Sequence, residues 1–194
     1  MADIRATGFG LPGESRDSPY DLLPARADHG LINVIIDTPK GSRNKFKFDE
    51  RGRCFRLSRI LPLGAAFPYD FGSIPGTLAD DGDPLDVLVI ADDASFVGCL
   101  LNAKLIGAVR AEQTEKGKTI RNDRLLAVPV TSVNPAEMSH IDELSSARIA
   151  EIEHFFVCYN QAHGRHFRPT GHAGPDEAER ALAAAEQRYE KSGQ

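Results

Sequence analysis

The residues most able to do chemistry are four aspartates within the seven-residue stretch Asp80–Asp86. The stretch leads directly into the apolar run Val87–Ile90, which predicts a strand that would hold the carboxylates against a rigid core. Carboxylates this close repel one another unless a cation lies between them. Aspartate oxygens without histidine or cysteine nearby favour Mg²⁺ or Mn²⁺ over Zn²⁺. The alternative is a solvated acidic turn, which the glycine and proline of the stretch would favour.

A second group of reactive side chains is basic and lies upstream, on or beside two predicted strands. It comprises Lys40, Arg43, Lys45, Lys47 and Arg59. An exposed, charged strand face is one interpretation of this group. Next to an acidic metal-binding cluster, however, a separate basic strip predicts a ligand rich in negative oxygens, and a phosphate bridged by Mg²⁺ fits. The metal would polarise the phosphoryl group and generate hydroxide, and the cations would bind the leaving oxygens.

The elements that must position these groups are short strands followed by helices. β-branched or alternating runs predict strands at 32–36, 44–49, 56–61, 87–90, 100–110 and 124–130, with a loop over 64–83 and a hairpin turn at 116–118. Alternation in the second strand places Phe46 and Phe48 on the core face and both Lys45 and Lys47 on the other. Helical spacing predicts helices at 142–161 and from 175 to about 191.

Strands first and helices second predict an α+β fold, a small closed β-barrel with the C-terminal helices packed outside. Residues 1–30 have no sustained period and are expected to form an irregular arm, so that 31–194 make up a single domain.

Composition narrows the function classes. The chain has 194 residues, a net charge of −5, no tryptophan and 7% aromatic residues, which disfavours nucleic acid as the main ligand. No window approaches 18 consecutive apolar residues, so we expect no membrane span, and the N-terminus lacks a signal-peptide pattern. Three widely spaced cysteines predict free, buried thiols in a reducing compartment.

Together with its neighbours, the acidic stretch resembles the signature of the soluble family I inorganic pyrophosphatases. The similar segments follow the family's order: 36–46, Phe67-Pro68 with Phe71-Gly72, 81–87, 125–129, and His154-Phe155-Phe156 followed by Tyr159. They cover roughly residues 32–161. The resemblance implies an OB-like five-stranded barrel and Mg²⁺-dependent hydrolysis of pyrophosphate to two phosphates, with Mn²⁺ as a possible substitute. It also implies a cytoplasmic homo-oligomer without a nucleic-acid or membrane partner.

The resemblance also implies roles for single residues. Asp83 would help to activate the attacking water as the catalytic carboxylate. The metal ligands would be Asp81, Asp86 and Asp37. The substrate-binding set would be Lys45, Arg59, Tyr159 and Arg124, joined by Lys47, which alternation places on the same strand face as Lys45.

Several positions depart from the family's pattern. Lys47 stands where the family has a metal-side glutamate, and Asn122 where it has a metal-ligating aspartate. The remaining departures are Asp37 for glutamate, Phe67 and Phe71 for two tyrosines, Arg124 for lysine and Asn160 for lysine. Glu112 and Glu115 are candidates for a further acidic ligand, and a one-residue shift of the alignment would make Asp123 the ligand in place of Asn122. We therefore expect fewer bound metal ions than the family's full set.

Two other functions remain open at this point. The changed pocket would also suit a divergent relative that hydrolyses another phosphoanhydride or is only weakly active. A non-catalytic OB-type binding module is the third possibility.

Overall fold

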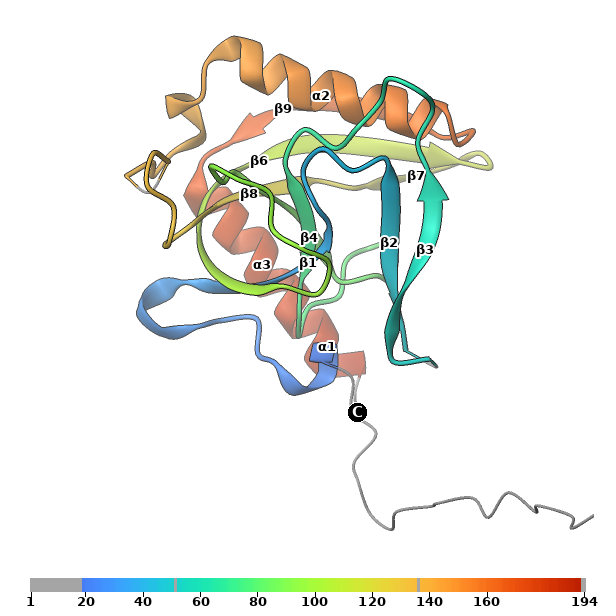
Figure 1. The fold of residues 1–194 in the computed structure, drawn as a ribbon. Coiled ribbons are helices and arrows are strands. Elements are labelled where there is room, and N and C mark those ends of the chain that lie inside the picture. The colour runs from blue at the N-terminus through green and yellow to red at the C-terminus, as the bar shows by residue number, and fades with distance from the viewer. Residues whose placement is uncertain (1–18, 51, 136, 193–194) are drawn as a thin grey trace, which may run out of the picture.

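Five strands close into a ring that forms the centre of the molecule. The computed structural model describes residues 19–50, 52–135 and 137–192, drawn as a ribbon in Figure 1. The ring follows the order β1 (Ile32–Thr38), β4 (Asp70–Ile74), β5 (Leu85–Val89), β8 (Arg124–Pro129) and β6 (Leu100–Glu115), and β6 pairs back to β1. Only β5 and β8 run parallel; the other pairs of the ring are antiparallel. The predicted α+β class and the five-stranded barrel are confirmed.

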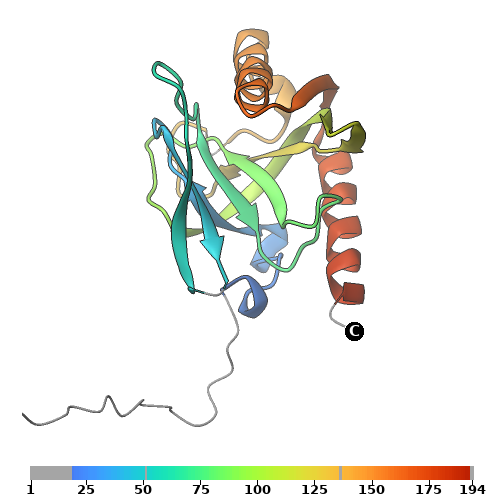
Figure 2. The same cartoon turned by 90° about the vertical axis from the view of Figure 1, so that its right-hand side faces the viewer.

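The remaining strands lie outside the ring. β2 (Asn44–Asp49) and β3 (Cys54–Ile60) form a separate two-stranded sheet, whereas β7 (Lys118–Arg121) and β9 (His166–Ala173) pair with β6. Figure 2 shows the β2–β3 hairpin and α3 on opposite sides of the barrel. The hairpin therefore forms one wall beside the barrel, and its inward face can carry a site.

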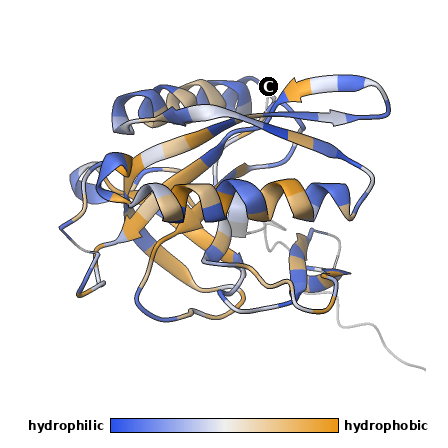
Figure 3. Cartoon of the chain, turned by 90° about the horizontal axis from the view of Figure 1, so that it is seen from above, coloured by the Kyte–Doolittle hydropathy of each residue, from blue (hydrophilic) through white to orange (hydrophobic). Residues whose placement is uncertain are grey.

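Two helices cover the barrel. Helix α2 (Ser146–Gln161) begins after Ser145, whose hydroxyl accepts the N–H of Arg148, and α3 (Pro175–Ser192) has acidic residues in its first turn, which favours helix initiation. One apolar cluster includes Phe156 of α2 and the other includes Leu182 of α3. Figure 3 shows α2 lying across barrel strands that are mostly hydrophobic. Short helical turns complete the fold: α1 (Pro19–Leu22), η1 (Asp28–Gly30) and η2 (Ile141–Glu143). Within the described ranges, no helix combines the length and the apolar character needed to cross a bilayer.

Three strands were not predicted: β4, β9 and the short β7, which follows the predicted hairpin turn at 116–118. The segment interpreted as a loop over 64–83 contains β4, which is buried at every position and therefore shows no alternation of polar and apolar residues. Its Gly72 packs so tightly that a Cβ there would lie 2.3 Å from the carbonyl oxygen of Ile35. The second missed strand, β9, contains Pro169 and Gly171, and its pairing with β6 compensates for its low strand propensity.

Two further expectations are corrected. Phe46 and Phe48 are only half-buried and belong to neither apolar cluster, because the hairpin stands apart from the barrel. The three cysteines are free, as predicted, but Cys54 and Cys158 are exposed rather than buried.

The predicted arm over 1–30 is only partly visible, because residues 1–18 lie outside the described residues. From residue 19 onward the arm is hydrogen bonded to the barrel. The backbone N–H of Asn33 donates to the Ala25 carbonyl oxygen (2.9 Å), and its side chain donates to that of Pro24 (2.9 Å). These bonds fix the position of the arm against the start of β1.

The close approach at Gly72 makes a first prediction. Gly72→Ala should lower the free energy of unfolding by about 3 kcal/mol, because backbone atoms cannot give way as side chains can. This corresponds to a fall in Tm of roughly 6–12 °C, measured by calorimetry. Gly41→Ala is the matched control, since its surroundings are open and only its φ of +79° is strained; we expect about 1 kcal/mol there. Equal losses at the two positions would contradict the steric explanation.

Candidate active site

The acidic stretch 80–86 forms the turn between β4 and β5 and is fixed by its own hydrogen bonds. The N–H of Ala79 donates to the carbonyl oxygen of Asp83 (2.8 Å), and the N–H of Asp83 donates to Oδ1 of Asp81 (3.2 Å). At Asp86 the chain is already in β5, whose buried neighbours anchor the turn. The carboxylates therefore stand on a defined platform at one end of the barrel.

Arg124 provides the most buried cation of the site. It begins β8, the parallel neighbour of β5, and its guanidinium forms an ion pair with Asp86. The side chain is only 6% exposed and lies over the rings of Phe156 (5.1 Å) and Phe167 (5.7 Å). Burial lowers the pKa of Arg124 to about 10, although the charge of Asp81 opposes that shift. Its Nε is buried without a hydrogen-bond partner, so a donor remains available to an anion.

Lys45 lies on an aromatic surface. Its Nζ is 4.4 Å from the centroid of the Phe71 ring and 5.4 Å from that of Tyr159, with which it also forms a hydrogen bond. Burial lowers the pKa of Lys45, whereas Tyr159 and the charge of Asp37 act in the opposite direction. Phe71, which lacks a hydroxyl, thus supports the lysine through its ring face.

Arg59 is the cross-strand partner of Lys45 in the β2–β3 hairpin. Directly opposed residues of an antiparallel pair project to the same face, so the two cations share one wall of the site. Nη1 of Arg59 is buried and has no hydrogen-bond partner. Like Nε of Arg124, it is a donor that an oxyanion could satisfy.

Asp37 is buried in β1 and is held by two hydroxyl groups. The Tyr20 hydroxyl donates to Oδ1 (2.8 Å), and Oγ of Ser73 donates to Oδ2 (3.2 Å). Burial raises the pKa of Asp37 to about 6, partly offset by the Tyr20 hydrogen bond and by the charges of Lys45 and Lys47. Sequence reasoning missed Tyr20, because only the docking of the arm brings it to β1.

Lys47 reaches the acidic turn directly. Its Nζ lies 2.6 Å from Oδ1 of Asp83, and the two side chains are 57% and 54% exposed. The burial of β2 does not alternate strictly and its pairing with β3 shifts register between Lys45 and Phe46, but the charges of Lys45 and Lys47 both act on Asp37.

The β6–β7–β8 segment contributes amides at its inward positions. Asn122 is buried and donates from Nδ2 to Oε1 of Gln113 (3.2 Å), a partner that the sequence analysis did not single out. Asp123 accepts the Ala111 N–H (3.1 Å) and pairs with Arg121 (2.6 Å). The two glutamates considered as ligands pair elsewhere, Glu112 with Arg168 (2.6 Å) and Glu115 with Arg165 (2.8 Å).

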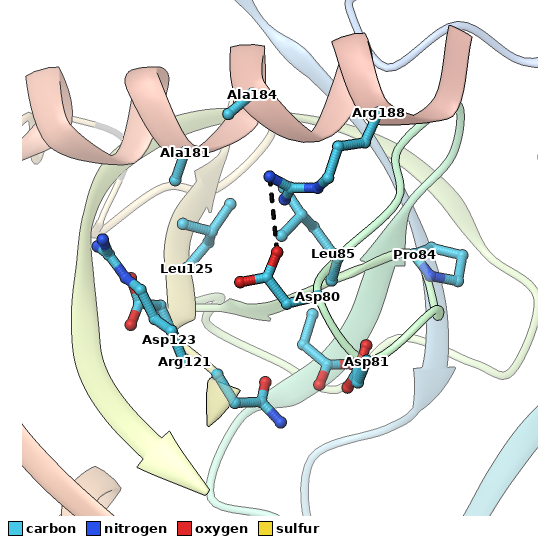
Figure 4. Close-up of a pocket in the computed structure, with 13 residues that line it drawn as sticks. Asp80, Asp81, Pro84, Leu85, Arg121, Asp123, Leu125, Ala181, Ala184 and Arg188 are labelled. Atoms are coloured by element: carbon cyan, nitrogen blue, oxygen red, sulfur yellow. Dashed lines mark hydrogen bonds and ion pairs between the residues drawn. The ribbon is translucent and has the colours of Figure 1, made fainter. Parts of the chain in front are cut away.

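A cavity of about 150 Å³ lies between the acidic turn, the β7–β8 connection and α3. Figure 4 shows Asp81 and Asp123 on two sides of it, with Arg188 of α3 reaching toward Asp80 (3.6 Å). Asp86 and Asn122 also line the cavity, whereas Glu112 and Glu115 do not.

The donor set fits a hard cation, although it is not preformed. Asp81 and Asp86 supply carboxylate oxygens to the same cavity, without histidine or cysteine. In the part of the chain that the structure describes, no three acidic, histidine or cysteine side chains converge as a ready metal site. A divalent cation must therefore compete with Arg124 for Asp86.

Comparison with known proteins decides the family. The profile of inorganic pyrophosphatases matches residues 34–190. The chain belongs to this family. The pyrophosphatase from Synechocystis is 43% identical over 137 residues, covering 71% of this chain and 79% of that protein. The one from Streptomyces coelicolor is 36% identical over 163 residues, covering 84% and 98%.

Solved structures of inorganic pyrophosphatases support the same family assignment. The crystal structure of the inorganic pyrophosphatase from Thermus thermophilus gives a TM-score of 0.79 at 29% identity, covering 87% of this chain and 97% of that one. The predicted family and the predicted activity, hydrolysis of inorganic pyrophosphate, are confirmed by these relatives. The two alternative functions are not favoured. Tyr20 lies outside the matched segment 34–190.

The environment of Asp37 in this pyrophosphatase makes a second prediction, for metal-free protein in chelator. Its pKa is about 6 in the folded chain against an ordinary value of 3.8, so the folded state binds the proton more tightly. Protonated Asp37 therefore contributes to the free energy of unfolding at low pH, and this contribution is lost as pH rises through about 6. Asp37→Asn should therefore gain stability relative to the native chain between pH 4 and 7.5, by up to about 3 kcal/mol.

Thermal unfolding across that pH range checks the trend. Asp92→Asn is the control, because the Val133 N–H lowers the pKa of Asp92 below its ordinary value of 3.8, so the stability of this variant relative to the native chain should stay constant across the range. A stability difference between Asp37→Asn and the native chain that does not change with pH would refute the raised pKa.

Proposed function

We propose that this pyrophosphatase hydrolyses pyrophosphate with Mg²⁺, or with Mn²⁺ in its place, held by Asp81 and Asp86, with Asp37 as a further ligand. The observation that carries the proposal is the contact between two charge sets, since Lys47 lies 2.6 Å from Asp83 and Arg124 pairs with Asp86. The carboxylates stand on the β4–β5 turn, and the cations Lys45, Arg59 and Arg124 project from the hairpin and β8. Pyrophosphate, bridged by a metal to one set, would contact the other.

The phosphate oxygens would be bound by Lys45, Arg59, Arg124 and Tyr159. Two of these residues keep buried donors without a partner, Nη1 of Arg59 and Nε of Arg124, and an oxyanion would satisfy both. The rings under Lys45 exclude water, which strengthens its attraction for a phosphate oxygen. These cations would also stabilise the negative charge that develops on the leaving phosphate.

The proton of the attacking water would pass to Asp83. A divalent cation, when bound, supplies Lewis-acid polarisation of the phosphoryl group and lowers the pKa of water. Asp83 is more than half exposed, and the buried Arg124 pairs with Asp86 instead, so Asp83 can reach a water molecule. Lys47 must leave Asp83 before the carboxylate can accept the proton.

Phosphate release from a panel of substrates tests the function. We expect rapid release from pyrophosphate with Mg²⁺, slower release with Mn²⁺ and none in chelator. The panel also contains tripolyphosphate and nucleoside triphosphates, which should react more slowly. A preference for another anhydride, or full activity in chelator, would contradict the proposal.

The role of Asp83 makes a third prediction. Asp83→Asn should lower kcat by roughly 10²–10⁴-fold, the range of general-base catalysis, with a smaller change in metal affinity. Steady-state phosphate release, with Mg²⁺ titrated at each pyrophosphate concentration, separates the two effects. Asp142→Asn is the matched control, because its side chain is 67% exposed and lies on η2, outside the site. A near-native kcat for Asp83→Asn would exclude this role.

We also propose a cytoplasmic homo-oligomer with no nucleic-acid or membrane partner. The net charge of −5 disfavours binding to a phosphate backbone. Exposed apolar side chains away from the site, such as Leu63 (88%) and Val133 (83%), offer surface for self-association. Light scattering would give the subunit number, and a monomer at micromolar concentration would contradict the oligomer.

A further inference from the structure

Lys47 is a cation placed between two carboxylates of the site. Its Nζ lies 2.6 Å from Oδ1 of Asp83, and its charge also acts on Asp37 of β1. Both members of the Lys47–Asp83 pair are more than half exposed. Solvent screens such a pair, so a ligand of higher charge can break it.

The cavity beside this pair has less negative charge than its polar lining suggests. The amide of Asn122 lines it and donates a hydrogen bond of 3.2 Å to Oε1 of Gln113. Asp86 is paired with Arg124, and Asp123 with Arg121. An added divalent cation therefore finds two carboxylates of the lining, Asp86 and Asp123, already paired with cations of the protein.

We propose that Lys47 competes with the divalent cation for Asp83 and exchanges this carboxylate for a phosphate oxygen when pyrophosphate binds. In the free protein the ammonium repels a metal ion near Asp83 and weakens its binding. In the complex the ammonium contacts the phosphate, and Asp83 becomes available to the attacking water. Lys47 is thus a substrate-binding residue that couples metal affinity to occupancy of the phosphate site, and the inference rests on the proposed metal and phosphate sites.

Binding without turnover tests the exchange. Calorimetric titration with Mn²⁺ alone, and separately with inorganic phosphate alone, is compared for the native chain and Lys47→Met. Removing the ammonium should tighten Mn²⁺ binding about three- to tenfold, because the repulsion is screened by solvent. The same change should weaken phosphate binding by a similar factor, since one cationic contact is lost. A substitution that merely disturbs the fold would not shift the two affinities in opposite directions.

The coupling itself is measured with imidodiphosphate, in which nitrogen replaces the bridging oxygen of pyrophosphate. The ratio of Mn²⁺ affinities with and without this ligand should be smaller for Lys47→Met than for the native chain. By linkage, the ratio of imidodiphosphate affinities must fall by the same factor. Lys118→Met is the matched control, because Lys118 is exposed on β7 beside the β6–β7 turn, outside the site; its affinities should equal the native ones.

Asp81→Asn separates failure of this inference from failure of the proposed function. If Asp81→Asn weakens Mn²⁺ binding while Lys47→Met leaves it unchanged, the metal site stands and the competition by Lys47 is refuted. If Asp81→Asn has no effect, the assignment of the metal site is wrong, and the inference falls with it. Tighter Mn²⁺ binding without weaker phosphate binding would refute the exchange.

Discussion

The site depends on the ion pair between Arg124 and Asp86. A guanidinium as buried as that of Arg124 needs an anion, and the partner it finds is the carboxylate at the start of β5. Because β5 and β8 are parallel neighbours, with Val87 opposite Leu125, the residues just before these positions lie side by side. The pair therefore joins the acidic turn to the basic side of the site. Separating a buried pair by removing one partner typically costs about 3–5 kcal/mol.

The aromatic residues beneath Lys45 provide the second constraint. Phe67 and Phe71 stand where the resemblance led us to expect tyrosines, and their ring centroids are 5.4 Å apart. Phe67 also packs against Tyr159 (5.8 Å), which keeps its hydroxyl. The loss of two hydroxyl groups therefore leaves an intact ring surface. Lys45 lies against this apolar ring surface, with its Nζ 4.4 Å from the Phe71 centroid.

Local signals account for the parts of the fold that could be predicted. The bounds of β2 follow from strict alternation, the β6–β7 turn at Lys116–Gly117 from its glycine, and the start of α3 from Pro175. β4 could not be predicted in this way, because a strand buried on both faces has no period. β9 is a strand through its pairing with β6, a contact between segments far apart in the sequence.

The residues of the candidate site also fall into two groups, those that local sequence patterns identify and those that only tertiary contacts bring to the site. Asp81, Asp83 and Asp86 could be identified because they are crowded within one short stretch, and the strand pattern placed Lys45 and Lys47 on one face. Tyr20 and Gln113 were missed, because each reaches the site through a contact that no local pattern encodes. The partners of the carboxylates were also beyond sequence reasoning, and it is these partners that determine how a metal can enter.

The most direct test of these contacts is anomalous scattering from crystals grown with Mn²⁺ and imidodiphosphate. The account predicts Mn²⁺ beside Asp81 and Asp86, with the phosphate oxygens on Lys45, Arg59 and Arg124. It further predicts that Nζ of Lys47 has left Asp83 for a phosphate oxygen. Mn²⁺ away from the acidic turn, or Lys47 still paired with Asp83 in the complex, would contradict it.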